Sequence, residues 1–160
     1  DTGGATTQAL GVLTGVMYQD SVRKQPVWLD YWPGSGAVSV DTNHPVRAYV
    51  ADNPNQLFQV SSDASLTNRA TAVAAIFANT DLGTSARTGS TDTGKSNSEA
   101  SVANIAATAT LPLRIVGIVD DDANSDYTVA GIPLIVRLNA HFNAGTRRFD
   151  SQTTADSTGL

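Results

Sequence analysis

Residues 89–96 read Gly-Ser-Thr-Asp-Thr-Gly-Lys-Ser, which matches the phosphate-loop pattern of nucleotide-binding proteins at every fixed position. A working phosphate loop joins a buried strand to the N-terminus of a helix, so that backbone amides and the Lys surround the phosphates. Here residues 84–88 contain no apolar run, and too few residues follow Ser96 to complete a wound parallel sheet. We therefore expect a polar surface loop in which Lys95 binds no nucleotide.

Other residues of catalytic type lack the surroundings that their chemistry needs. Asp-Thr-Gly occurs at residues 1–3 and 92–94, and an aspartic protease requires two such aspartates held together at the ends of buried strands. One triplet starts the sequence and the other lies in the polar loop, so we expect no dyad. His44 and His141 have no metal-binding neighbours in the sequence. A catalytic combination of either His with a Ser and an Asp stays an open alternative.

Four oxygen-bearing side chains alternate along one acidic segment, as calcium ligands do: Asp120, Asp122, Asn124 and Asp126. The rest of the calcium-loop pattern is missing, because Ser125 replaces the Gly of the sharp turn and Gly131 stands where a bidentate Glu belongs. A solvated acidic turn is our expectation, with a weak surface calcium site at these four residues as the alternative. We expect no cofactor.

The aromatic residues of one short segment are candidate interface residues. Residues 26–32 contain Trp28, Tyr31 and Trp32, and Trp and Tyr are enriched at protein interfaces because they combine a large apolar area with a polar tip. If the segment is one continuous strand, the two Trp share a face and Tyr31 lies on the other. A place in the core remains the alternative for both Trp.

Alternating apolar residues predict several short strands in the first part of the chain. Residues 10–18 form one, with Val12, Thr14, Val16 and Tyr18 on one face. Residues 37–40 are another. Residues 46–61 predict a β-hairpin, because Asp52-Asn53-Pro54-Asn55 is a strong turn signal between two alternating runs.

In the second part of the chain the spacing of apolar residues first becomes helical and then returns to that of strands. Apolar residues at helical spacing predict a short helix over residues 65–77, with Ser65 as its N-cap. Residues 81–97 are polar and form a long surface loop. Residues 109–119 and 133–139 are the most apolar segments. They supply much of the predicted core: Leu111, Leu113, Ile115, Ile118, Leu134, Val136 and Leu138.

Composition limits the classes of partner. The net charge is −5, and the ten Lys and Arg are scattered apart from one adjacent pair, so we expect no nucleic acid partner. No apolar run approaches the roughly 18 residues of a membrane span, and the first residues lack the pattern of a signal peptide. The chain has no Cys, which excludes disulfides and thiolate chemistry.

Together these patterns predict a mainly β protein. We expect a single domain over residues 1–160, built as a small β-barrel or sandwich with at most one short helix and long surface loops. The N-terminal segment 1–9 and the polar tail 150–160 are expected to be loose. Charged residues make up only 16% of the chain, well below the usual quarter, so the surface suits close contact with neighbouring molecules.

Two stretches carry a resemblance to a known class of proteins. Residues 44–60 read His-Pro-Val-Arg-Ala-Tyr-Val-Ala-Asp-Asn-Pro-Asn-Gln-Leu-Phe-Gln-Val, and the second stretch comprises residues 109–127 with 134–141. They resemble small virion structural proteins of tailed bacteriophages, of the capsid decoration or cement type. The resemblance covers roughly the middle and C-terminal two-thirds of the chain. It rests on the residues of strands and turns and includes no catalytic residue.

The resemblance implies a β-rich protein on the capsid surface of the virion, without enzyme activity and without a transferable functional site. Its implied partners are the major capsid protein and neighbouring copies of itself, and the open sheet edges favour a trimer on the particle. The alternative function is a receptor- or glycan-binding module on a phage tail or fibre, which would use a similar fold and exposed aromatic residues.

Overall fold

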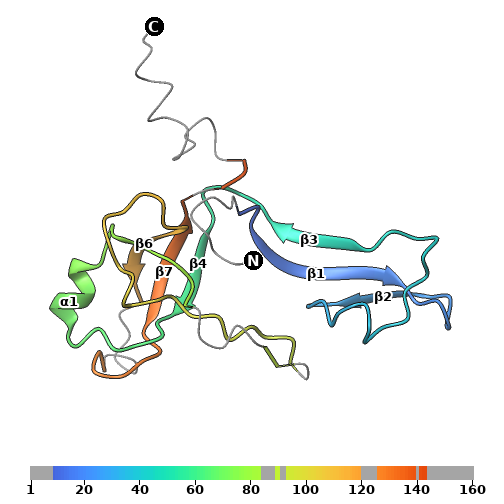
Figure 1. Ribbon diagram of the computed structural model, residues 1–160, viewed down its shortest axis with the longest axis horizontal. Helices are drawn as coiled ribbons and strands as arrows, with labels where there is room; N and C mark the ends of the chain where they lie inside the picture. Colours follow the sequence, from blue (N-terminus) through green and yellow to red (C-terminus); the bar gives the residue numbers. More distant parts are fainter. Residues whose placement is uncertain (1–8, 84–88, 91–92, 120–125, 140, 144–160) are drawn as a thin grey trace, which may run out of the picture.

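The computed structural model describes residues 9–83, 89–90, 93–119, 126–139 and 141–143. Within these ranges the chain forms seven strands and one short helix, and the strands make two antiparallel sheets (Figure 1). The predicted mainly β class with one short helix is confirmed. Neither sheet closes into a barrel, and the sandwich-like alternative fits. The single domain stays a prediction, and residues 1–8 and the tail 150–160 lie outside the described residues.

The first sheet is a three-stranded unit with the order β2-β1-β3. It consists of β1 (Val12–Gln19), β2 (Pro26–Leu29) and β3 (Arg47–Ala51). A tight turn joins β1 to β2, in which the Asp20 amide donates to the Gln25 carbonyl at 2.9 Å and the Lys24 amide donates to the Asp20 carbonyl at 2.9 Å. The central strand β1 therefore pairs with a near neighbour in sequence on one side and a distant strand on the other.

A register shift in β1 changes which residues share a face. The pairing with β3 is irregular between Leu13 and Gly15, so Thr14 is an extra residue, as in a β-bulge. Side chains alternate strictly only along a regular strand, and the insertion reverses the alternation. Leu13 consequently shares a face with Val16, while Val12 lies on the opposite face. The predicted common face of Val12 and Val16 is wrong for this reason.

The second sheet contains the main hydrophobic core. Its order is β4-β7-β6-β5, built from β4 (Leu57–Ser61), β5 (Asn79–Thr80), β6 (Leu113–Ile118) and β7 (Pro133–Leu138). Of the predicted core residues, Leu113, Ile115, Leu134 and Val136 are buried, and Leu111, Ile118 and Leu138 are partly buried. The two most apolar segments of the sequence thus form the central strands of this sheet.

The hairpin predicted over residues 46–61 is wrong, although its turn exists. The Asn53 carbonyl accepts from the Gln56 amide at 3.0 Å, and the Asn53 side chain accepts from the Asn55 amide at 2.9 Å. However, β3 pairs with β1 and β4 pairs with β7, so the chain passes from one sheet to the other at this turn. Local turn chemistry reverses the chain, whereas the choice of strand partner depends on distant residues.

Two other predicted elements change in extent. The predicted strand over residues 37–40 is absent: a turn over residues 35–37 reaches its start, and Val40 makes only a single bridge, with Asp20. The helix is α1 (Arg69–Ala74), capped by Asn68, whose side chain accepts from the Thr71 amide at 2.9 Å. Ser65 is not the cap, because Thr67 has a positive φ of 67°, which ends any helical path before Asn68. The described residues include no helix long and apolar enough to span a membrane.

Leu134→Ala should destabilise the protein by about 2–5 kcal/mol, because it leaves a cavity at a fully buried position of β7. The matched control is Leu57→Ala in β4, where the native side chain is 49% exposed, and its expected effect is about 0.5 kcal/mol or less. Denaturant unfolding of both variants measures the difference. Equal losses would contradict the placement of the core in the second sheet.

Candidate functional site

The open side of the first sheet carries a cluster of apolar side chains, exposed except for the half-buried Met17, which we call the aromatic face: Val12, Met17, Trp28 and Tyr49. Strand pairing places them together, since Met17 is opposite Trp28, Tyr49 is opposite Gly15, and Val12 follows beyond the bulge. Trp28 is 54% exposed, Val12 44% and Tyr49 40%. Monomeric proteins seldom leave grouped large apolar side chains in water without a binding purpose.

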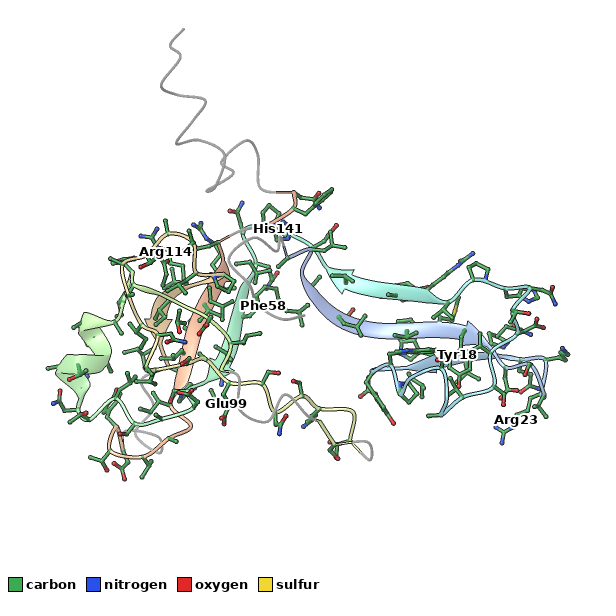
Figure 2. All side chains as sticks on the ribbon, viewed as in Figure 1. Tyr18, Arg23, Phe58, Glu99, Arg114 and His141 are labelled. Atoms are coloured by element: carbon green, nitrogen blue, oxygen red, sulfur yellow. The ribbon has the colours of Figure 1, made fainter. Side chains whose placement is uncertain are left out.

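A glycine gives Trp28 its position. A Cβ added at Gly15 would fall 2.3 Å from Cζ2 of Trp28, so the indole lies directly over the backbone of the central strand. Trp28 also packs against Tyr49, with ring centroids 4.7 Å apart and planes tilted by 56°. The two rings brace each other, and they present a rigid aromatic surface of low conformational entropy. Figure 2 shows the side chains of this sheet, with Tyr18 labelled on β1.

Trp28, Tyr31 and Trp32, which the sequence predicts as interface residues, lie in three different places in the structure. Only Trp28 belongs to the aromatic face. Trp32 packs edge-on against Tyr18, with ring centroids 6.0 Å apart at 82°, and Tyr18 lies on the other side of the sheet. Tyr31 lies against Gly94 of the polar loop. The predicted common face of Trp28 and Trp32 is wrong, because β2 ends at Leu29 and regular alternation ends with it.

Sequence reasoning missed Val12, Met17 and Tyr49 of the aromatic face, and also Gly15 beneath Trp28. The alternation of residues 46–51 does place Tyr49 on one face together with Arg47 and Ala51. Nothing in the sequence shows that β3 pairs with β1, and this pairing is what brings Tyr49 to Trp28. The small residue in the centre of a strand was the available signal for Gly15, since such a Gly often marks close approach of another group.

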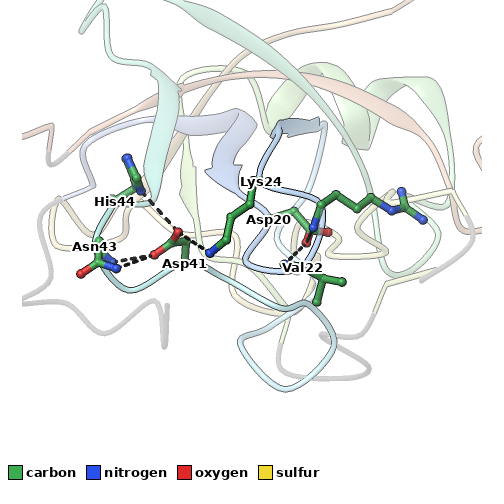
Figure 3. Close-up of polar contacts among 7 residues, drawn as sticks. Asp20, Val22, Lys24, Asp41, Asn43 and His44 are labelled. Carbon is green, nitrogen blue, oxygen red and sulfur yellow. Dashed lines mark hydrogen bonds and ion pairs between the residues drawn. The ribbon is translucent and has the colours of Figure 1, made fainter.

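A polar network holds the turn end of the first sheet (Figure 3). Asp41 is only 8% exposed, and it accepts hydrogen bonds from the Asn43 amide at 3.0 Å and from Nζ of Lys24 at 3.2 Å. These donors lower the pKa of Asp41, the Asn43 amide contributing most. The Asp41 amide donates to the Gln19 carbonyl at 2.8 Å. The network therefore fastens the 41–44 turn to the end of β1.

Asp20 organises the adjoining turn. Its carboxylate accepts from the amides of Val22 at 2.7 Å and Arg23 at 2.9 Å, and these two bonds, that of Arg23 first, lower its pKa. Lys24 follows with a positive φ of 55°, which turns the chain back into β2. All these contacts are local or join neighbouring turns, so they explain the shape of the sheet end without any ligand.

The acidic segment is described only at its end. Asp120, Asp122 and Asn124 lie outside the described residues, so the calcium alternative is not tested. Asp126 is exposed and accepts from the amide and hydroxyl of Thr128, and the hydroxyl contributes most to its lowered pKa. Among the described residues, no group of three or more His, Asp or Glu side chains is arranged to hold a metal ion.

The described residues of the loop that matches the phosphate-loop pattern form a small hairpin turn. Gly89 bridges Ser96, the Ser90 amide donates to the Lys95 carbonyl at 3.0 Å, and the Gly94 amide donates to the Ser90 carbonyl at 2.8 Å. Lys95 is exposed, and the one helix of the described residues, α1, precedes this loop. Residues 89–90 and 93–96 therefore lack the strand-to-helix setting that phosphate binding needs.

The two histidines lie in different surroundings. His44 has an exposed side chain, and its Nδ1 lies 3.7 Å from Oδ2 of Asp41. His141 is buried beside the start of the first sheet, and its Nδ1 accepts from the Asn143 amide at 3.0 Å. Within the described part of the chain, no Ser side chain hydrogen-bonds to either histidine. The aromatic face thus remains the strongest candidate site.

No protein-family model, curated protein or solved structure matches this chain. The candidate site consequently rests on the geometry of the chain's own residues.

Addition of ATP and magnesium should leave the melting temperature unchanged, because a ligand that binds the native state must raise it and the loop lacks the required setting. Lys95→Ala should unfold at the same temperature as the native protein, with or without ATP. Thermal unfolding over a range of ATP concentrations checks this. A concentration-dependent rise in the native protein that Lys95→Ala abolishes would establish a nucleotide site.

Asp41→Asn should lower the melting temperature near neutral pH, and the difference should shrink below about pH 4. The folded-state pKa of Asp41 is depressed, so its stabilisation is present above the unfolded value of about 3.9 and is lost as the pH falls through the folded value. Melting curves at several pH values measure this. The control Asp30→Asn removes the same charge from an exposed position, and a gap for Asp41→Asn that is independent of pH contradicts the argument.

Proposed function

We propose that this protein is a non-enzymatic structural component of a virus particle, which binds the outer surface of a phage capsid and stabilises the shell. The single observation that carries the proposal is the aromatic face, on which Trp28 is braced by Tyr49 and remains 54% exposed. Exposed aromatic side chains that are already ordered lose little entropy when a partner covers them. The family resemblance of residues 44–60 and of residues 109–127 with 134–141 supplies the identity of the partner in this proposal.

The surroundings of the aromatic face support binding to a protein surface. Arg47 lies opposite Met17 at its border and is exposed. Arg is the charged residue most enriched at interfaces, because its planar head group pairs with carboxylates and stacks on rings. The few charges of the chain also limit the desolvation cost of a close contact. A large protein surface with acidic groups near an apolar patch fits this arrangement.

Neighbouring copies are the second proposed partner. Each sheet has two edge strands, β2 and β3 in the first and β4 and β5 in the second. Edge strands present backbone groups that a neighbouring chain can pair with or cover. Closed rings satisfy every copy identically, and a trimer on the particle stays our favoured arrangement.

Trp28→Ala should weaken binding to purified phage heads about 30-fold, the equivalent of the roughly 2 kcal/mol that defines an interface hot spot. Val22→Ala is the control, because Val22 is 78% exposed but lies in the β1–β2 turn, away from the aromatic face. Binding is measured by sedimentation with heads stripped of the native protein, and shell strength by their survival on heating. Stripped heads that lose no heat resistance would defeat the proposal.

One observation favours the alternative, a receptor- or glycan-binding module on a tail or fibre. The indole of Trp28 lies over Gly15 and leaves its outer side exposed, and such a ring offers a platform for the apolar face of a sugar. The two proposals are separated by titrating oligosaccharides while following Trp fluorescence in a Trp32→Phe background, where Trp28 is the remaining Trp. A saturable change would favour the glycan module, as would location of the protein at tail structures alone.

A further inference from the structure

Described residues outside the strands connect the two sheets. Among the described elements, no strand of the first sheet contacts a strand of the second. The chain crosses between the sheets at residues 52–56, and close to this crossing Ala9 bridges His141 and accepts from the Phe142 amide at 2.9 Å. Asn143 donates to the Asp52 carboxylate at 3.4 Å. We call this region, residues 9, 52–56 and 141–143, the junction.

A junction at one place leaves two bodies free to rotate about it unless a second contact stops them. That second contact comes from the polar loop. Its base is fastened to the second sheet, since the amide of Ala100, a residue of the buried core, donates to the carbonyl of Ser61 in β4 at 2.8 Å, and Leu82 bridges Ala100. In Figure 1 the loop extends from the second sheet toward the first.

The tip of the loop meets the first sheet at Gly94. A Cβ added at Gly94 would fall 2.2 Å from Cδ1 of Tyr31 and 3.0 Å from Oδ1 of Asp30. The φ of Gly94 is +67°, in the left-handed region that favours glycine. Two independent requirements therefore select glycine here, the backbone conformation and the close approach of the Tyr31 ring.

We propose that residues 89–90 and 93–96 act as a strap that fixes the orientation of the first sheet relative to the second. The backbone bonds of Ser90 with Lys95 and Gly94 hold these three residues together, and Tyr31 supplies a flat surface against which the backbone of Gly94 packs. The junction and the strap together hold the first sheet at two separate places, which restricts its rotation to the line that joins them. This gives the segment that imitates a phosphate loop a mechanical role.

The strap also sets where the aromatic face lies relative to the rest of the molecule. Tyr31 follows Trp28 by three residues, so the strap holds the same end of the sheet that carries Trp28. A binding surface held in one orientation needs less ordering when it meets its partner. The contacts of the junction and the strap lie within the chain itself, so the strap stands or falls separately from the capsid proposal.

The absence of Cys from the chain makes the orientation directly measurable. Val22→Cys in the β1–β2 turn of the first sheet and Val73→Cys in α1, which contacts β6 of the second sheet, place two spin labels at exposed positions, 78% and 44% exposed in the native protein. Double electron–electron resonance then reports the distribution of distances between the labels. We expect a narrow distribution in the otherwise native chain.

Gly94→Ala should widen and shift this distribution, because the added methyl group cannot fit against Tyr31. Gly34→Ala is the matched control: its φ is +95°, so it suffers the same kind of backbone strain, but no atom lies within 4 Å of the added Cβ. Tyr31→Ala removes the ring without adding atoms, and it should widen the distribution as well. If Gly94→Ala does not fold, the distance distribution of Tyr31→Ala tests the strap by itself.

A distribution that stays narrow in both Gly94→Ala and Tyr31→Ala would overturn the strap, because the junction alone would then fix the orientation. A native distribution as wide as those of the variants would overturn it too, as would equal widening by Gly34→Ala. None of these results depends on capsid binding, and failure of Trp28→Ala to affect head binding would leave the strap untouched.

Discussion

Burial of the two central strands of the second sheet is the interaction on which the rest of the structure depends. Ile115 of β6 and Leu134 of β7 are fully buried, and each such side chain contributes about 1.5–3 kcal/mol on removal from water. Helix α1 contacts β6, and Ala100 at the base of the strap joins the same core. The first sheet has far less to bury, with Val16 and Tyr18 as its buried apolar residues in the described part of the chain. A three-stranded sheet of this kind gains stability chiefly from what it is attached to.

Aromatic rings in and next to the first sheet gain burial in another way, by packing against the backbone of a glycine. Trp28 lies over Gly15, and Tyr31 lies against Gly94. In both places the ring reaches backbone that a larger residue would cover, so one side of the ring is shielded without a deep core. The other side of Trp28 stays exposed. This arrangement explains how a small sheet keeps ordered aromatic residues at its surface. In a protein with a larger core, such residues would usually be buried.

The sequence predicted those features that depend on local pattern. Alternation located β1, and strong apolar runs located β6 and β7 together with their buried residues, because a central strand of a sheet must be apolar on its buried faces. Features that depend on which strands pair with each other could not be predicted from local pattern. Asn53 and Pro54 make a good turn, yet β3 and β4 enter different sheets, and the extra residue Thr14 reverses the faces of β1. The same limit applies to the candidate site: Trp28 was found by residue type, whereas Gly15 joins it through the pairing of β1 with β2 and Tyr49 through the pairing of β1 with β3.

The two sheets have different roles, and this difference affects what the protein can bind. Because the second sheet supplies the core, the first is free to leave Trp28 and Tyr49 outside the hydrophobic cluster, whose aromatic residues are Tyr127 and the partly buried Phe58. Exposed rings cost free energy in the isolated protein, and a partner that covers them recovers that cost. The recovery is largest when the rings are already ordered, as Gly15 and the contact between Trp28 and Tyr49 make them. Stability of the fold and affinity for a partner therefore draw on different residues, so the aromatic face can change with its partner while the buried strands keep the same core.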